Sequence, residues 1–115
     1  MRKLLEKDVE FEIAVLAEDM PVRGNALVSG DDDLDTQAEN EIIEDYNNGN
    51  EWAWCTVRVT ARWRDFVGAD FLGGCSYESE KDFIAGGYYE DMKARALATL
   101  NNELKTVKGK LEELA

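Results

Sequence analysis

One long alternating stretch constrains this chain more than any other feature. The residues from Glu51 to Tyr77 are rich in β-branched and aromatic side chains, and a turn that contains glycine interrupts them between Asp65 and Gly68. This pattern is typical of a β-hairpin. One face of the first hairpin strand is apolar, with Ala53, Cys55, Val57, Val59, Ala61 and Trp63. The opposite face mixes tryptophan with arginine, with Trp52, Trp54, Thr56, Arg58, Thr60 and Arg62.

Periodicity predicts further elements on either side of the hairpin. From Asp8 to Glu18 one set of positions is apolar throughout, which indicates a strand with one buried face: Val9, Phe11, Ile13, Val15 and Ala17 alternate with Glu10, Glu12, Ala14, Leu16 and Glu18. After a loop that holds the single proline and a run of capping residues, apolar side chains recur every four residues, which predicts an amphipathic helix from about Asp32 to Tyr46. Ser79 can cap a short helix that ends at the two glycines before Tyr88.

The apolar residues from Tyr88 onward predict a long C-terminal helix. From Leu97 their spacing becomes a heptad, with Leu97, Leu100, Leu104, Val107, Leu111 and Leu114. Such a helix extends roughly 40 Å, more than a three-stranded sheet can cover. Either Gly109 or fraying shortens the helix and its stripe packs on its own sheet, or the last heptads pair with a second copy and form a dimer.

The element order predicts an α+β fold of the type β-α-β-β-α. We expect a three-stranded antiparallel sheet with two helices on one face and a long C-terminal helix. If the first crossover is right-handed, the third strand lies between the first and the second. The 115 residues fit a single domain, 1–115, with a globular core at 8–100 and a helical extension at 101–115.

The charge is strongly acidic. The chain has 25 acidic and 13 basic side chains, a formal net charge of −12. Such a field repels phosphate backbones and anionic membranes and favours basic partners, although acidity also serves solubility. No apolar run approaches the length of a membrane span, and the first residues lack the apolar stretch of a signal peptide. We therefore expect a cytoplasmic protein without a membrane contact.

The sequence carries no pattern of a catalytic or cofactor site. There is no histidine to act as a general base, and neither a phosphate loop nor a zinc-type spacing is present. Cys55 and Cys75 lie on adjacent predicted strands, where they face each other if the turn centres on Asp65, and we expect two buried, reduced thiols. These features predict a protein that is not an enzyme and binds no metal or cofactor.

The region from Gly24 to Val57 contains carboxylates but no lysine or arginine. Its acids are Asp31, Asp32, Asp33, Asp35, Glu39, Glu41, Glu44, Asp45 and Glu51. The first of them have the alternate spacing of a calcium loop, but Thr36 and Ile42 occupy the positions of its glycine and its closing glutamate. The acids either form a solvated helix face or imitate phosphates and occupy a basic groove made for nucleic acid.

The face that carries Trp52 and Trp54 has two interpretations as well. Aromatic rings beside arginine are typical of sheets that bind single-stranded nucleic acid, but the net charge opposes this function, and we expect no direct nucleic-acid binding. A protein contact, or packing beneath the last helix, fits the two tryptophans better.

Several segments of the chain resemble a known group of proteins. They are Pro21-Val22-Arg23-Gly24-Asn25-Ala26, Trp52-Ala53-Trp54-Cys55, Thr60-Ala61-Arg62, Cys75-Ser76-Tyr77-Glu78-Ser79-Glu80 and Gly87-Tyr88-Tyr89-Glu90-Asp91-Met92. From Phe11 to Leu100 the chain is similar to small uncharacterised proteins carried by bacteriophages, prophages and plasmids. The resemblance provides no site residues, but it implies a mobile-element setting, in which small acidic proteins are often inhibitors of host defence.

Two hypotheses follow. The first is a non-enzymatic inhibitor of a host nucleic-acid-binding defence protein, of the anti-CRISPR or anti-restriction type, which binds the basic groove of that protein. Its partner-binding residues are the nine acids from Asp31 to Glu51 together with Trp52 and Trp54. The alternative is an interaction or structural module that forms a homodimer through the heptad residues from Leu97 to Leu114 and the tryptophan face.

Overall fold

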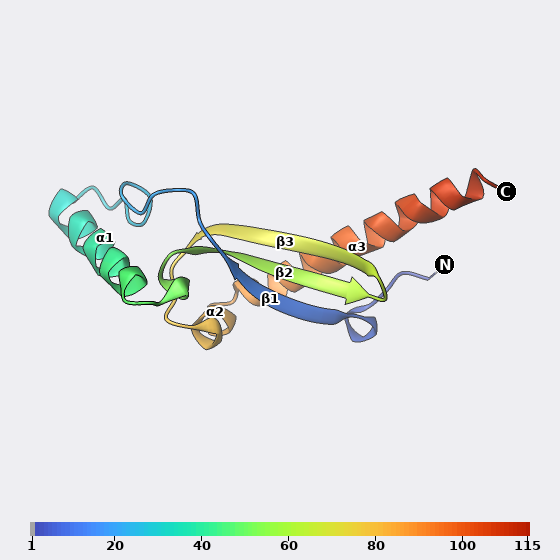
Figure 1. The fold of residues 1–115 in the computed structure, drawn as a ribbon, viewed down its shortest axis with the longest axis horizontal. Helices are drawn as coiled ribbons and strands as arrows, with labels where there is room; N and C mark the ends of the chain where they lie inside the picture. Colours follow the sequence, from blue (N-terminus) through green and yellow to red (C-terminus); the bar gives the residue numbers. More distant parts are fainter. Residues whose placement is uncertain (1) are drawn as a thin grey trace. The chain divides into compact units, whose positions relative to one another are not determined.

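The structure is a computed structural model that describes residues 2–115. Its elements are η1 (Glu6–Asp8), β1 (Glu10–Leu16), α1 (Asp32–Asn47), η2 (Glu51–Ala53), β2 (Cys55–Trp63), β3 (Phe66–Cys75), α2 (Glu80–Ala85) and α3 (Tyr88–Glu112) (Figure 1). The predicted α+β class, the three-stranded antiparallel sheet and the long C-terminal helix are confirmed.

The hairpin between β2 and β3 turns more tightly than expected. Only Arg64 and Asp65 separate the two strands, and Arg64 has a φ of 55°. Trp63 and Phe66 stack across the turn with ring centroids 6.3 Å apart, and the Arg64 guanidinium lies 4.8 Å above the Trp63 ring. Gly68, expected in the turn, lies within β3 and is buried.

The predicted strand order is wrong. The order in the sheet is β1-β2-β3, so β2 and not β3 is the central strand (Figure 1). The right-handed crossover rule applies to parallel strands, whereas β1 and β2 are antiparallel neighbours. The 38 residues between Leu16 and Cys55 therefore do not cross the sheet; they carry α1, whose main packing partner is η2.

The contacts of the described residues group into two compact units, and each strand passes through both. The first unit contains residues 2–14, Arg58–Phe71 and Tyr88–Ala115. The second unit contains Val15–Val57 and Leu72–Gly87.

In the first unit, α3 packs on one face of the strands. In Figure 1 α3 passes behind them, and Met92, Ala96 and Leu100 on its inner side are completely buried. Gly68 allows this close approach, because a Cβ at that position would lie 2.3 Å from the backbone nitrogen of Leu100. Leu104 is also buried, so the helical extension expected from residue 101 begins later.

In the second unit, the core forms around η2 and the start of β2. Phe83 of α2 is completely buried and stacks on Trp52, with ring centroids 5.7 Å apart. Tyr77 packs edge-on against both rings. The side chain of Ser79 accepts a hydrogen bond from the backbone N–H of Asp82, which confirms the predicted cap of α2.

Candidate functional site

The helix α1 of the second unit is largely exposed to solvent. Its only buried residue is a glutamate, Glu39. The apolar residues Ala38, Ile42 and Ile43 are half-buried, whereas Leu34 and Tyr46 keep about half of their surface, 50% and 47%. Only part of the apolar stripe predicted by the four-residue spacing therefore packs against the protein, and most of the helix surface faces solvent. That stripe consists of Leu34, Ala38, Ile42 and Tyr46.

Glu39 belongs to the structural framework. Its carboxylate accepts a hydrogen bond of 2.7 Å from the backbone N–H of Gly24 and pairs at 3.4 Å with the guanidinium of Arg23. Arg23 also donates to the side chain of Asn40 at 2.6 Å. These contacts fasten the loop before α1 to the helix, so Glu39 does not lie on the solvated face where it was expected.

Asp31 and Asp35 also have structural roles. Asp31, one of the predicted run of capping residues at 29–33, is the N-cap of α1, and its side chain accepts from the backbone N–H groups of Asp33 and Leu34. Asp35 accepts from the hydroxyl of Ser29 at 2.6 Å and from its backbone N–H at 3.1 Å. Both carboxylates therefore order the beginning of the helix.

The remaining acids of α1 point outward. Five of them are exposed, and we call them the acidic face of α1: Asp32, Asp33, Glu41, Glu44 and Asp45. In the described part of the chain the carboxylates of Asp32, Asp33 and Glu44 accept no hydrogen bond and form no ion pair. Glu41 accepts only from Gln37, at 3.4 Å, and Asp45 only from Asn50, at 2.9 Å. Glu51, which follows on η2, is exposed too.

No cation compensates the acidic face from within its own segment. There is no lysine or arginine from Gly24 to Val57, and the preceding Arg23 is committed to Glu39. At about 1.5 Å per residue, the five carboxylates from Asp32 to Asp45 span roughly 20 Å. The mean spacing along the helix axis is about 5 Å per charge, wider than the 3.4 Å per phosphate along one DNA strand, with the longest gap between Asp33 and Glu41.

A hollow of about 280 Å³ lies beside the C-terminal half of α1. Ile43, Tyr46 and Asn47 line it from the helix, and Trp54 and the segment 18–22 line it from the other side. This hollow offers an apolar contact next to the carboxylates of Glu44 and Asp45.

The two tryptophans predicted to bind a partner belong to the core of the second unit. Trp54 is 6% exposed, and its indole N–H donates to the carbonyl of Met20 at 2.7 Å. Trp52 is half-buried and stacks on Phe83. Both indole rings therefore make their contacts within the protein, Trp54 with Met20 and Trp52 with α2. Strand alternation alone does not show whether these two side chains are buried.

Most of the predicted heptad residues of α3 also pack within the protein. Leu100 and Leu104 are buried, and Leu97 and Val107 are half-buried. Only Leu111 and Leu114 remain largely exposed, at 61% and 83%. Of the six heptad residues predicted to form a dimer, only these last two therefore remain largely available for contact with a second copy.

Both cysteines are buried free thiols. Burial raises the pKa of Cys55 to about 12, with smaller contributions from Cys75 and Glu18. Burial also raises the pKa of Cys75, whose thiol donates to the carbonyl of Leu72 at 3.2 Å. Both sulfurs therefore stay protonated near neutral pH, a state that suits packing rather than nucleophilic chemistry.

Comparisons of the chain with family models, with curated proteins and with solved structures found no match. The resemblance to proteins of mobile elements stays an expectation. Within residues 2–115 no cluster of three or more potential metal-ligating side chains is present. In the same residues, no helix has both the length and the apolar character needed to cross a membrane.

Proposed function

We propose that this protein is a non-enzymatic inhibitor that acts in the bacterial cytoplasm and binds the basic groove of a host nucleic-acid-binding defence protein. The acidic face of α1 takes the place of the phosphates in that groove. The anti-CRISPR and anti-restriction types of inhibitor are the expected classes.

The observation that carries this proposal is the set of exposed carboxylates without a counter-ion. Acids that only stabilise a fold usually have partners, as Asp31, Asp35 and Glu39 have here. The acidic face of α1 has no cation in its segment and is repelled by the rest of a chain of net charge −12. A basic groove would relieve this repulsion and would also be reached faster through electrostatic steering.

Asp31 and Glu39 support the same function, because they keep α1 ordered before a partner binds. The cap at Asp31 and the contacts of Glu39 with Gly24 and Arg23 fix both the start and the middle of α1. Binding by a helix that is already ordered loses less conformational entropy than binding by a flexible acidic tail. The exposed Leu34 and the hollow at Tyr46 add apolar contacts at the two ends of the acidic face.

The test is affinity capture from a bacterial lysate with three versions of the protein. The first is the parent chain. The second changes the acidic face to amides, with D32N, D33N, E41Q, E44Q and D45N. The third is a matched control that removes five exposed charges from the first unit, with D65N, D91N, E103Q, E112Q and E113Q.

We expect the parent and the control to capture a subunit of a nucleic-acid-binding defence complex and the acidic-face variant to lose it. Added nucleic acid should release the captured subunit, because both ligands occupy the same groove. The captured amount should also fall as salt rises, since exposed charges are screened beyond about 8 Å at 0.15 M salt. Equal capture by all three versions would show that the acidic face serves solubility alone.

A further inference from the structure

The hollow beside the C-terminal half of α1 lies entirely within the second unit. Its apolar walls are Ile43 and Tyr46 of α1, Trp54 between η2 and β2, and the segment 20–22. The Tyr46 side chain is 47% exposed, so its ring is accessible from solvent. The volume of about 280 Å³ lies just below the range of about 300–1,000 Å³ for small-molecule sites, and it suits a single long side chain.

Two carboxylates, Glu18 and Asp19, also line the hollow. Glu18 is held in place, because it accepts hydrogen bonds from the backbone N–H of Gly74 and, at 3.2 Å, from that of Met20. These bonds lower the pKa of Glu18, and a carboxylate with about four lone-pair sites can still accept further donors. Asp19 is exposed, and within residues 2–115 its carboxylate accepts no hydrogen bond and forms no ion pair. The hollow therefore contains one oriented and one free carboxylate.

The end of α1 adds to the negative potential at the hollow. Carbonyl groups at the C-terminus of a helix carry a partial negative charge, and the last turn of α1 contains no basic residue that would compensate it. No lysine or arginine is among the residues that line the hollow. Arg23, which follows the lining segment 18–22, is already paired with Glu39 and Asn40. A positively charged group that enters the hollow is therefore attracted from several sides.

The walls and the carboxylates together select the kind of side chain that fits. An apolar side chain would cover Glu18 and Asp19 without donating a hydrogen bond, which is costly for buried charges. A lysine ammonium supplies the charge, but it is a compact and strongly hydrated group. An arginine guanidinium is planar and more weakly hydrated, stacks on aromatic rings, and has five N–H donors that match a carboxylate. Of the three, arginine alone uses the Tyr46 ring, the apolar walls and the carboxylates together.

We propose that the hollow binds an arginine side chain of the partner protein. The aliphatic part of that side chain packs on Ile43 and Trp54, its guanidinium lies on the ring of Tyr46, and its N–H groups donate to Glu18 and Asp19. This inference rests on the proposed function, because a groove that binds phosphates supplies arginine and lysine side chains. The exposed carboxylates of α1 attract both types of side chain, whereas the hollow distinguishes arginine from lysine.

The test uses two peptides that differ in one residue. One is acetyl-Gly-Lys-Gly-Arg-Gly-Lys-Gly-amide, and the other has lysine in place of the arginine, so the two carry the same charge. The full chain is titrated with each peptide at about 0.05 M salt, and its N–H signals are followed by NMR. We expect the arginine peptide to bind about fivefold more tightly than the lysine peptide. It should shift mainly the signals of residues 18–22 and 43–47 and of the Trp54 indole.

Two substitutions in the hollow should remove this preference. Y46A removes the aromatic wall and D19N removes the free carboxylate, and each should bring the ratio of the two affinities toward one. Both side chains are exposed, and circular dichroism establishes that the variants keep the fold. The matched controls Y88A and D91N change an exposed tyrosine and an exposed aspartate of α3 and should keep the preference. The acidic-face variant should bind both peptides more weakly and keep their ratio.

Equal affinities of the parent chain for the two peptides would overturn the inference, as would an arginine preference that Y46A and D19N leave intact. In the lysate experiment, Y46A should reduce capture of the partner about fivefold and Y88A should not, and equal capture by these two variants would also contradict it. The peptide titration needs no host protein, so the inference can fail while α1 still captures a partner. Equal capture by the parent, the acidic-face variant and its control contradicts the proposed function instead.

Discussion

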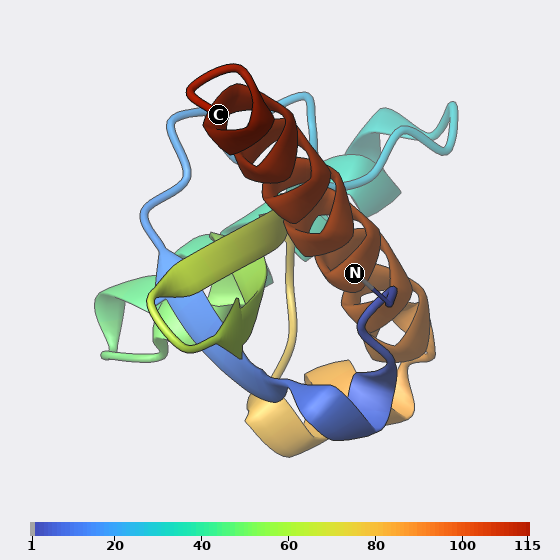
Figure 2. The same cartoon turned by 90° about the vertical axis from the view of Figure 1, so that its right-hand side faces the viewer.

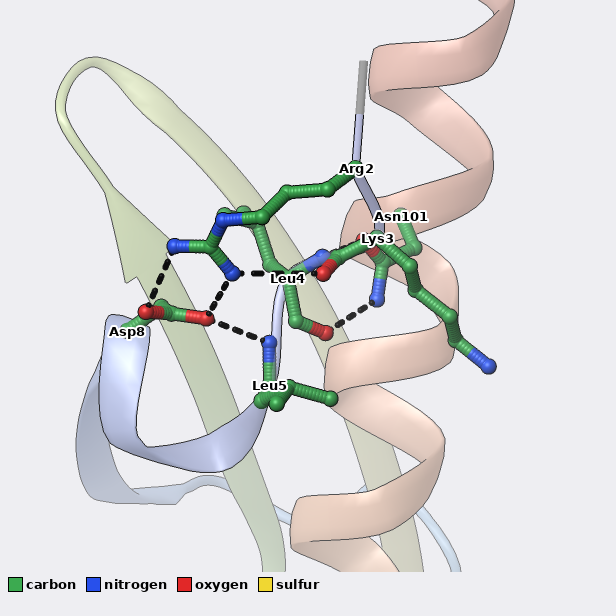
Figure 3. A network of polar contacts seen from close by, with 6 residues as sticks. All are labelled: Arg2, Lys3, Leu4, Leu5, Asp8 and Asn101. Carbon is green, nitrogen blue, oxygen red and sulfur yellow. Dashed lines mark hydrogen bonds and ion pairs between the residues drawn. The ribbon is translucent and has the colours of Figure 1, made fainter.

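The side-chain amide of Asn101 on α3 pairs with the backbone of Leu4 through two hydrogen bonds. Its Oδ1 accepts from the Leu4 N–H at 2.9 Å, and its Nδ2 donates to the Leu4 carbonyl at 3.0 Å (Figure 3). Leu4 itself is 6% exposed. The N-terminal segment is thus fastened along α3 (Figure 2), although almost the whole chain separates the two residues.

Replacing Asn101 by alanine should detach this segment. Loss of both hydrogen bonds leaves backbone groups of a buried residue without partners, and we expect the free energy of unfolding to fall by about 1–3 kcal/mol. Urea denaturation measures the change. The matched control is N102A, because the side chain of Asn102 is exposed and forms no hydrogen bond in the described residues. Equal effects of the two substitutions would contradict the role of Asn101.

Two glycines should respond to alanine in opposite directions. At Gly68 a methyl group would lie 2.3 Å from the nitrogen of Leu100 and 2.6 Å from the carbonyl oxygen of Ala96. Because both are backbone atoms of α3, G68A should destabilise the protein by about 3 kcal/mol or more. Gly109, also on α3, has open space around it, and G109A should stabilise by about 0.5–1 kcal/mol. Thermal unfolding of both variants tests the packing of α3 on β3; a mild effect of G68A would argue against it.

The stability of the protein should decrease in acid, in part because of Glu18. Its pKa is lowered because the carboxylate accepts hydrogen bonds from the backbone N–H groups of Gly74 and Met20. The folded pKa therefore lies below the unfolded value of about 4.3. The stabilisation is complete above that value and is lost as the pH falls through the folded pKa. Asp8 acts in the same direction, because hydrogen bonds from Arg2 and from the Leu5 N–H hold its pKa well below the usual range.

The measurement is the urea midpoint of the parent and of E18Q between pH 7 and pH 3. E18Q should be less stable than the parent at pH 7 and should lose less stability on acidification. The slope that remains in E18Q comes from Asp8 and from other carboxylates with partners. Parallel curves for the two proteins would show that Glu18 makes no such contribution.

The cysteine thiols should react only after unfolding. With the pKa of Cys55 raised to about 12 and that of Cys75 raised as well, almost no thiolate is present at pH 8, and both sulfurs are buried. A disulfide reagent such as DTNB should label the native protein slowly and label both thiols rapidly in urea. Rapid labelling of the native chain would mean that the core of the second unit opens easily.

Much of the fold could be predicted because its elements depend on local patterns. Strand alternation and four-residue helical spacing predict β1, α1, the hairpin and α3. The capping residues at 29–33 and the cap at Ser79 follow in the same way from their own neighbours. These features follow from interactions within a few residues, so the sequence alone determined them. It also determined the surplus of acids and the absence of cations from Gly24 to Val57.

Other features depend on contacts between distant residues, and only the tertiary structure decided them. Glu39 and Glu44 look alike in the sequence of α1, but Glu39 meets the Gly24 N–H of a loop that has no periodicity. The aromatic ring of Trp54 lies in the core because the carbonyl of Met20, 34 positions away, accepts its indole N–H. The position of β2 between β1 and β3 is likewise a long-range outcome. Local propensity specifies which segments are helix or strand, whereas the competition for buried surface and hydrogen-bond partners specifies which face of each segment remains free to function.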